Sequence, residues 1–324
     1  MEFVIVNITL KEIKGMTNRI RQIANNDIVI VAFSGGLDST VVLNLAKRAL
    51  GNERLLAVHV DFGFYTYNIT KINVKMICEM LQVKLLKISG EAQQIDIMKG
   101  GPDCNLCTKR VKLGLIRSFA KDKVILTGSN QSDSWGKYGY DYYNGFYAPL
   151  FDYSKSEIIN IANYLEIEVK HIGENDYREG CKLKHLLKPL VNPFYHGQAV
   201  NIANELLLQE IHKSRFSTKI ANVKIVGPLN KNIALVNIFP LPDRDWLERI
   251  REKIGQLEWI EECHIIDCPL ELVIKASKGQ YNNLRSRYWI EKGRLQPEFS
   301  FPIKFKWLLT TNHKLKTFQV VSYN

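Results

Sequence analysis

The 324-residue sequence lacks several features that would each place it in a large class of proteins. It has no run of 18 apolar residues, so no membrane-spanning helix is expected. Its first residues include acidic Glu2 and lack a basic stretch, which argues against a secretory signal. No internal repeat or low-complexity tract interrupts the chain. We therefore expect a cytoplasmic protein without a membrane partner.

The common phosphate-binding patterns are also missing. The sequence contains neither GxxxxGK[ST] nor GxGxxG, so the Walker loop and the dinucleotide fingerprint are excluded. Cysteine is sparse, with six residues and a single CxxC pair at Cys104 and Cys107. A zinc site built from two CxxC pairs is therefore not predicted. In a cytoplasmic enzyme, metal or redox chemistry explains such thiols better than disulfide bonds do.

The composition is that of a globular protein, with 46% hydrophobic and 24% charged residues. The length allows two domains. The formal net charge of +11 permits a polyanionic partner such as tRNA. An ordinary basic surface, or a site for ATP alone, explains the charge equally well, and both interpretations stay open.

The sequence VIVAFSGGLDST, residues 29–40, is the strongest local signal. Residues 29–33 have the composition of a buried parallel strand. Gly35 and Gly36 permit a sharp turn with outward-facing N–H groups. Apolar residues at helical spacing follow over residues 40–50. A strand, a glycine turn and a helix N-terminus together predict an anion site.

Strands and helices alternate over the first two thirds of the chain, which predicts an α/β fold with a doubly wound parallel sheet. We expect a helical lead-in over residues 1–27, an α/β domain that carries the anion site over 28–215, and a smaller α+β domain over 219–324 whose role the sequence does not assign. Several polar motifs follow predicted strands. Because ligands bind beyond the carboxyl ends of parallel strands, these motifs should converge on one face.

The stretch SGGLDST resembles the SGGxDS[ST] loop of the ATP pyrophosphatase (PP-loop) superfamily. Its members split ATP between the α and β phosphates and transfer AMP to a substrate oxygen. The resemblance implies ATP and Mg²⁺ as cofactors, with Asp38 in a catalytic role. The residues expected to bind the nucleotide are Ala32, Phe33, Ser34, Gly35, Gly36, Asp38, Ser39, Thr40, His59, Gly128 and Asn130. His59 has a second interpretation as a packed core residue.

Three thiols accompany this loop, namely Cys104 and Cys107 in DCNLCTKR and Cys181 in GCKLKHLLKP. Together with TGSNQSD and SKSEIINIANYLEI, their order resembles that of iron–sulfur tRNA thiolases and, more closely, LarE-type sulfurtransferases over about residues 28–190. The resemblance implies a [4Fe–4S] cluster held by the three cysteines. Structural zinc with His171 or His185 as a fourth ligand is one alternative. Cys181 as a persulfide carrier without a cluster is another.

The function implied is an ATP-dependent sulfurtransferase that acts as a homo-oligomer. A sulfide or persulfide donor supplies the sulfur, and the acceptor is a tRNA base or a small cofactor precursor. Cys181 is a catalytic candidate, and Lys109, with Arg110 or Lys182 as alternatives, is a candidate for charge stabilisation. The sequence after Cys181 is Lys182-Leu183-Lys184, which differs from the motif that follows the last cysteine in that family. The acceptor therefore stays open.

Two other functions stay open. One is an amide ligase of the same superfamily that uses ammonia. The other is a nucleotide- or RNA-binding protein with structural zinc. Basic and aromatic residues over 285–306 permit RNA contact.

Overall fold

The structure is a computed structural model that describes residues 10–132, 141–176 and 178–324. The chain forms two compact units. The first unit comprises residues 1–61, 68–90 and 109–171, and the second comprises 62–67, 91–108 and 172–324. This division differs from the expected boundary near residue 215, because three segments that precede it belong to the second unit.

The first unit is built around a sheet with the order β3-β2-β1-β4-β6-β5. All neighbouring strands are parallel except β5 and β6, which are antiparallel. The elements are α1 (Leu10–Ala24), β1 (Val29–Ala32), α2 (Leu37–Leu50), β2 (Leu55–Asp61), α3 (Asn68–Met80), β3 (Lys84–Ser89), α6 (Gly114–Ala120), β4 (Ile125–Leu126), β5 (Tyr142–Tyr143), β6 (Phe146–Tyr147) and α8 (Lys155–Tyr164).

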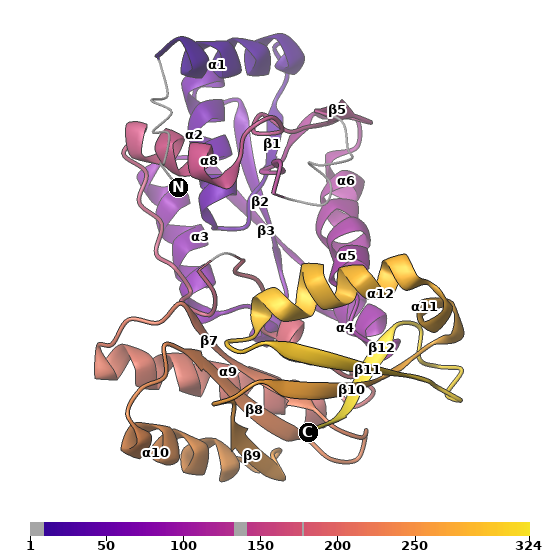
Figure 1. Ribbon diagram of the computed structural model, residues 1–324. Coiled ribbons are helices and arrows are strands. Elements are labelled where there is room, and N and C mark those ends of the chain that lie inside the picture. The colour runs from indigo at the N-terminus through magenta and orange to yellow at the C-terminus, as the bar shows by residue number, and fades with distance from the viewer. Residues whose placement is uncertain (1–9, 133–140, 177) are drawn as a thin grey trace. The chain divides into compact units, whose positions relative to one another are not determined.

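Helices cover both faces of this sheet, as a doubly wound fold requires. In Figure 1, α2, α3 and α8 lie to one side of the sheet and α6 lies to the other. The strand order changes direction between β1 and β4, because the chain builds outward from β1 to β3 and then returns to β4. Such a switch point leaves a crevice at the carboxyl ends of the two strands, where ligands bind. The predicted fold class is confirmed.

Buried aliphatic side chains hold the first unit together. Val29 and Val31 on β1 and Leu43 on α2 are each fully buried in its core. Fully burying one such side chain contributes about 1.5–3 kcal/mol. The core therefore fixes β1 and α2, and with them the loop that joins the two.

The segment from Cys104 to Ala120 is not one regular α-helix. The short helix α5 (Cys104–Leu106) leads into the π-helix η2 (Cys107–Leu113), and α6 follows. π-helical turns inside α-helices occur often at functional sites.

The second unit contains two three-stranded sheets, with the orders β7-β8-β9 and β11-β10-β12. Each combines one parallel and one antiparallel pair, which confirms the expected mixed α+β texture. The elements are η1 (Gly63–Tyr65), α4 (Glu91–Lys99), α5, η3 (Lys182–His185), α9 (Tyr195–Ser214), β7 (Ile220–Val226), β8 (Ile233–Phe239), α10 (Arg244–Gly255), β9 (Glu262–Ile265), β10 (Leu270–Ala276), α11 (Lys278–Asn282), α12 (Leu284–Ile290), η4 (Glu291–Leu295), η5 (Gln296–Glu298), β11 (Ile303–Leu309) and β12 (Phe318–Tyr323).

The core of the second unit lies on one face of the β11-β10-β12 sheet. Leu272, Ile274 and Phe318 are fully buried there and belong to the same hydrophobic cluster as Leu235 of the other sheet. α11 and α12 are separate helices, because the Asn283 side chain accepts a hydrogen bond from Ser286 N and caps α12. No helix among the described residues is long and apolar enough to span a bilayer.

Candidate functional site

A tight glycine bend joins β1 to α2 in the first unit. Gly35 has φ +78°, a conformation that favours glycine, and a Cβ at this position would lie 2.8 Å from Val74 Cγ2. Gly36 is the N-cap of α2. The first N–H groups of a helix lack intrahelical partners and, with the helix dipole, attract anions. The predicted anion site therefore has the expected backbone.

Hydroxyl groups brace the bend from inside. Ser39 Oγ and Thr40 Oγ1 both donate to Gly36 O, at 3.0 and 2.9 Å. Ser34 N donates to Ser39 Oγ at 3.2 Å, and the oxygens Ser34 Oγ and Ser39 Oγ lie 3.0 Å apart. These bonds fix the shape of the loop before any ligand arrives.

The loop after β4 reaches the same bend, as the strand order predicts. A Cβ on Gly128 would lie 3.0 Å from Ser39 N, so glycine leaves room for this close approach. Asn130 is 1% exposed, and its Nδ2 donates to Asp38 Oδ2 at 3.0 Å. The structure thus brings Gly128, Asn130 and Asp38 together at the β1/β4 switch point.

Asp38 has a second partner, Lys155, which the sequence analysis missed. Lys155 Nζ lies 2.5 Å from Asp38 Oδ1, and the two side chains are 40% and 25% exposed. Lys155 is the first residue of α8, after a capping box made by Ser154 and Glu157. A positive charge in the first turn of a helix is unfavourable, because it lies at the positive end of the helix dipole. This placement was the only sequence signal that Lys155 makes an interaction outside its own helix.

His59 lies in β2, in contact with the end of β1. Its Nδ1 lies 3.0 Å from Phe33 O, and its Nε2 is buried without a hydrogen-bond partner in the described part of the chain. Burial lowers the pKa of His59, against the opposing effect of that bond to Phe33. Phe33 is buried, and its N–H donates to Val58 O; Ala32 is half-buried. His59 is therefore a neutral residue that fixes the end of β1.

The three cysteines of the sequence analysis all belong to the second unit. Cys107 is buried, whereas Cys104 and Cys181 are partly exposed. Arg294 Nη2 lies 3.4 Å from Cys104 Sγ, and its Nη1 donates to Pro102 O at 2.9 Å. Gln94 Nε2 donates to Cys181 Sγ at 3.2 Å. Two of the three sulfurs thus accept N–H groups from side chains distant in sequence.

The spacing of these thiols does not support the zinc alternative. Zinc at 2.3 Å from each sulfur would hold thiolates roughly 3.8 Å apart. Within the described ranges, the one group of three or more potential ligands with all donor atoms within 4.8 Å is Glu174, His185 and Glu298. His185, considered above as a fourth zinc ligand, therefore lies with two glutamates rather than with the cysteines.

That buried group is already balanced in charge. Lys184 Nζ lies 2.7 Å from Glu174 Oε1 and 3.1 Å from Glu298 Oε1, while Lys224 Nζ lies 3.3 Å from Glu298 Oε2. Burial lowers the pKa of Lys224 to about 8, and burial together with Lys224 holds the pKa of His185 well below its usual value. Two ammonium groups already face two carboxylates, so a divalent cation would add uncompensated charge.

Of the lysines considered for charge stabilisation, Lys109 is exposed and Lys182 is buried. Lys109 is exposed on η2. Lys182 is buried, and its Nζ lies 2.9 Å from Phe64 O, 2.7 Å from Asn201 Oδ1 and 2.7 Å from Glu205 Oε1. These three oxygens hold the Lys182 ammonium inside the second unit. Of the two, only Lys109 offers an exposed charge.

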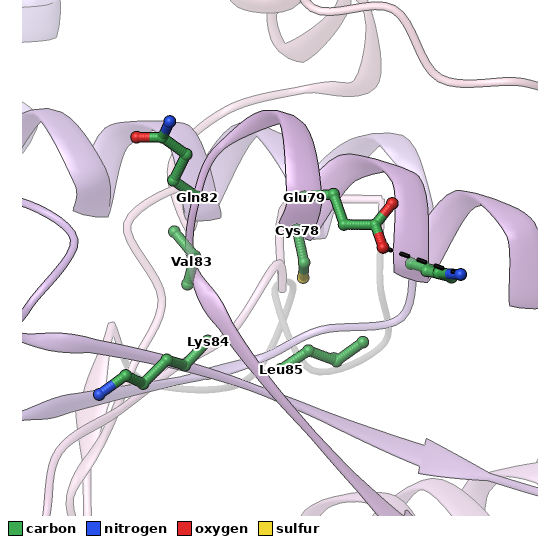
Figure 2. Close-up of a pocket in the computed structure, with 7 residues that line it drawn as sticks. Cys78, Glu79, Gln82, Val83, Lys84 and Leu85 are labelled. Atoms are coloured by element: carbon green, nitrogen blue, oxygen red, sulfur yellow. Dashed lines mark ion pairs between the residues drawn. The ribbon is translucent and has the colours of Figure 1, made fainter.

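A shallow pocket of about 340 Å³ lies between α3 and β3 (Figure 2). Its lining includes Cys78 and the ion pair between Lys75 and Glu79, whose Nζ and Oε1 are 3.8 Å apart. Burial raises the pKa of Cys78 to about 11, so its thiol is unreactive near neutral pH. None of the predicted site residues lines this pocket.

A parallel sheet whose switch point carries a braced glycine bend, a helix N-terminus and a carboxylate defines a nucleotide-binding α/β unit of the ATP pyrophosphatase class. A protein-family model described as NAD synthase matches residues 9–172, half of the chain. The chain belongs to this family, within the PP-loop ATP pyrophosphatase superfamily.

Curated relatives share this region. A glutamine-hydrolyzing GMP synthase of Hydrogenovibrio crunogenus is 26% identical over 234 residues, which cover 72% of this chain and 41% of that one. A GMP synthase of Neisseria meningitidis is 27% identical over 217 residues, covering 67% and 39%. This chain spans about two fifths of the length of these relatives. A solved NH3-dependent NAD synthetase from Campylobacter jejuni is similar at 23% identity and a TM-score of 0.41, over 49% of this chain and 73% of that one.

Proposed function

We propose that this chain transfers AMP from ATP to an oxygen of an acceptor, releases pyrophosphate, and then replaces the activated oxygen with sulfur. The glycine bend between β1 and α2, in a chain that belongs to an ATP pyrophosphatase superfamily, supports the transfer of AMP. The observation that carries the replacement of oxygen by sulfur is the set of three cysteines in one compact unit, two of which accept side-chain hydrogen bonds at sulfur.

The residues at the bend suit ATP and Mg²⁺. A Cβ at Gly35 or Gly128 would fill the bend, and the start of α2 suits a diphosphate. Asp38 is the carboxylate that would hold Mg²⁺, an ion that prefers carboxylate, phosphate and water oxygens. Mg²⁺ supplies charge neutralisation on the phosphates. Lys155 and Asn130 orient the Asp38 carboxylate, and the Lys155 ammonium is positioned to accompany the phosphates.

Sulfur replaces oxygen without a change of oxidation state. Hydrosulfide attacks the carbon that bears the adenylylated oxygen, a carbon–sulfur bond forms, and the carbon–oxygen bond breaks. AMP leaves with that oxygen and the sulfur loses its proton. The acceptor oxygen must be that of a carbonyl or amide group, because AMP makes such an oxygen a leaving group.

Three thiolates without a fourth are the donor set for a [4Fe–4S] cluster with one open iron. Cys104, Cys107 and Cys181 would hold it, and the open iron would supply a binding position for sulfide. The N–H groups of Gln94 and Arg294 suit thiolate sulfur in either the bound or the free form.

A nitrogen ligase is the second candidate. The relatives named GMP synthase favour it, since their printed name denotes enzymes that hydrolyse glutamine. Such an enzyme would use the same bend, with ammonia in place of hydrosulfide. It would not need the three thiols, so substitution of Cys181 separates the two candidates.

An open basic sheet face supports RNA as the acceptor. Lys304 and Lys306 on β11 are exposed, and their register places them beside Glu271 and Val273 on β10, while exposed Lys275 lies beside Leu308. The alternate residues of both strands form the core. Lysines protect edge strands such as β11 from aggregation, but β10 is the central strand of its sheet. Lys275 is therefore better explained by a phosphate backbone.

The test is pyrophosphate release by the 324-residue chain purified without oxygen, with ATP, bulk tRNA and either hydrosulfide or ammonia. We expect release that depends on hydrosulfide, iron in the purified protein, and loss of both in Cys181→Ala. Cys268→Ala, which changes an exposed thiol outside the trio, is the matched control and should behave as wild type. Ammonia-dependent release that survives Cys181→Ala would favour the nitrogen ligase.

A further inference from the structure

The helix α12 carries two neighbouring aromatic side chains that face solvent. Tyr288 is 56% exposed and Trp289 is 46% exposed, and their rings meet in an edge contact with centroids 5.8 Å apart. No residue of α12 is buried. Aromatic side chains gain most when they are buried in a core or an interface. This helix therefore presents an aromatic surface that the described part of the chain leaves open.

The surroundings of Trp289 hold its indole against the helix. A Cβ at Gly293, one turn later, would lie 3.0 Å from Trp289 Cε3, so the ring lies against the backbone of that glycine. Gly293 belongs to the π-helix η4, and its carbonyl accepts a hydrogen bond from Arg178 Nη1 at 3.1 Å. On the opposite side of α12, the Arg287 guanidinium lies 5.9 Å from the centroid of the Trp307 ring on β11. An aromatic ring that is already held in place loses less entropy when it binds a partner.

The exposed charges around this aromatic pair are positive. The exposed charged residues of the segment 278–292 are Lys278, Arg285 and Lys292. Arg285 precedes Trp289 by one helical turn, so the two share a face of α12. Glu291 is the one acidic residue of the segment, and its Oε1 accepts a hydrogen bond from Trp307 Nε1 at 2.6 Å. A cationic surface attracts polyanions, and the bases of single-stranded nucleic acids stack on exposed aromatic rings.

We propose that Tyr288 and Trp289 form a stacking platform for unpaired bases of single-stranded RNA, with the cations of the segment 278–292 beside its phosphates. Paired bases are stacked within their own duplex, so the platform selects an unpaired segment. The inference rests on the proposed function for the choice of RNA, and it adds that the protein contacts an unpaired part of its acceptor. The lysines proposed above for the phosphate backbone lie on the other face of β11, because they alternate with Trp307 along that strand.

The test is binding of fluorescently labelled RNA to the 324-residue chain, measured by fluorescence anisotropy without ATP. One probe is a single-stranded oligoadenylate of about 12 nucleotides, and the other is the same strand paired with its complement. Wild type is compared with Trp289→Leu, Tyr288→Leu and Trp289→Phe, none of which changes the charge. Tyr164→Leu, which removes a tyrosine that is 46% exposed on α8 of the first unit, is the matched control.

We expect each leucine variant to raise the dissociation constant for the single strand by about 5- to 150-fold, as for the loss of one stacked base. Trp289→Phe should keep most of the affinity, because phenylalanine also stacks. The salt dependence of binding should not change, since no phosphate contact is removed. Affinity for the duplex should stay at the wild-type value, and Tyr164→Leu should bind both probes as wild type does.

Unchanged affinity for the single strand in both leucine variants would overturn the proposal, as would equal losses for the single strand and the duplex. If only binding to phosphatidylserine vesicles or self-association is lost, the surface belongs to a membrane contact or to a second copy of this chain. Should Trp289→Leu fail to fold, Tyr288→Leu, at the more exposed position, decides the question.

The platform and the proposed function can fail separately. Selective loss of single-strand binding in a protein without hydrosulfide-dependent pyrophosphate release would refute the proposed function and leave the platform intact. Hydrosulfide-dependent release by a protein whose RNA affinity does not depend on Tyr288 or Trp289 would refute the platform alone.

Discussion

Removal of the Lys155 ammonium should weaken ATP binding far more than it weakens the fold. The pair between Lys155 and Asp38 is 40% and 25% exposed, so its contribution to stability is that of a surface pair, about 1 kcal/mol or less. In Lys155→Met the melting temperature should fall by only about 2–4 °C. The Asp38 carboxylate would meanwhile lose the cation that balances it beside the phosphate site.

The expected effect on Mg²⁺-ATP is larger. A hydrogen bond to a charged group contributes about 1.5–3 kcal/mol, which corresponds to a dissociation constant about 10- to 150-fold higher. Titration calorimetry with Mg²⁺-ATP measures this directly and requires no acceptor. Lys155→Arg keeps the charge and should lose less affinity. An affinity equal to that of wild type in Lys155→Met would refute the role given to Lys155, and a collapse in stability would refute the view that the pair is a surface pair.

Three further predictions concern other parts of the molecule. Gly35→Ala should lower the free energy of unfolding by about 1–2 kcal/mol, because alanine is strained in the left-handed conformation, and it should abolish ATP binding. Gly36→Ala is the control and should melt like wild type, because a Cβ there would meet an ordinary contact at 3.6 Å. Equal melting temperatures for the two variants would contradict this prediction. Burial lowers the pKa of His196 from 6.5 to about 4, so unfolding free energy should fall by about 3 kcal/mol as pH drops from 6.5 to 4, because the unfolded chain takes up the proton first. The free energy of unfolding, measured by urea titration, should depend less on pH in His196→Gln than in wild type. His212→Gln, which changes an exposed histidine on the same helix, should keep the wild-type pH dependence. The same pH dependence in His196→Gln and wild type would refute the prediction. Replacing Lys275, Lys304 and Lys306 with Gln should reduce the number of counterions released on tRNA binding, measured from its salt dependence, by about two to three. The same change at three other exposed lysines, Lys11, Lys14 and Lys219, should have little effect. Equal reductions in the two triple variants would indicate general charge attraction.

The backbone of the predicted anion site was predictable from sequence because its signals are local. A buried strand, two glycines and a helix start lie within a dozen residues, and each has its own physical requirement. The approach of Gly128 and Asn130 to this bend also followed from sequence, since parallel strands place their carboxyl ends at one edge. Asp38 and Asn130 are 92 residues apart and form a hydrogen bond at 3.0 Å.

Contacts between distant polar residues were not predictable in the same way. Lys155, Gln94 and Arg294 carry no pattern that marks them, because each acts through one side chain on a partner 87 or more residues away. The π-helix at Cys107 and the assignment of residues 91–108 to the second unit were also missed. Hydrophobic spacing describes regular helices, and it does not determine which of two cores a short segment joins.

The exchange of an ATP-activated oxygen for sulfur can be measured by incubating the protein, without oxygen, with ATP, bulk tRNA and equal amounts of isotopically labelled hydrosulfide and ammonia. Mass spectrometry of the nucleosides then identifies the atom that was transferred. We expect labelled sulfur in one nucleoside, with one pyrophosphate released per sulfur gained. Labelled nitrogen in the product, with no sulfur, would rule out sulfur transfer and identify the chain as a nitrogen ligase.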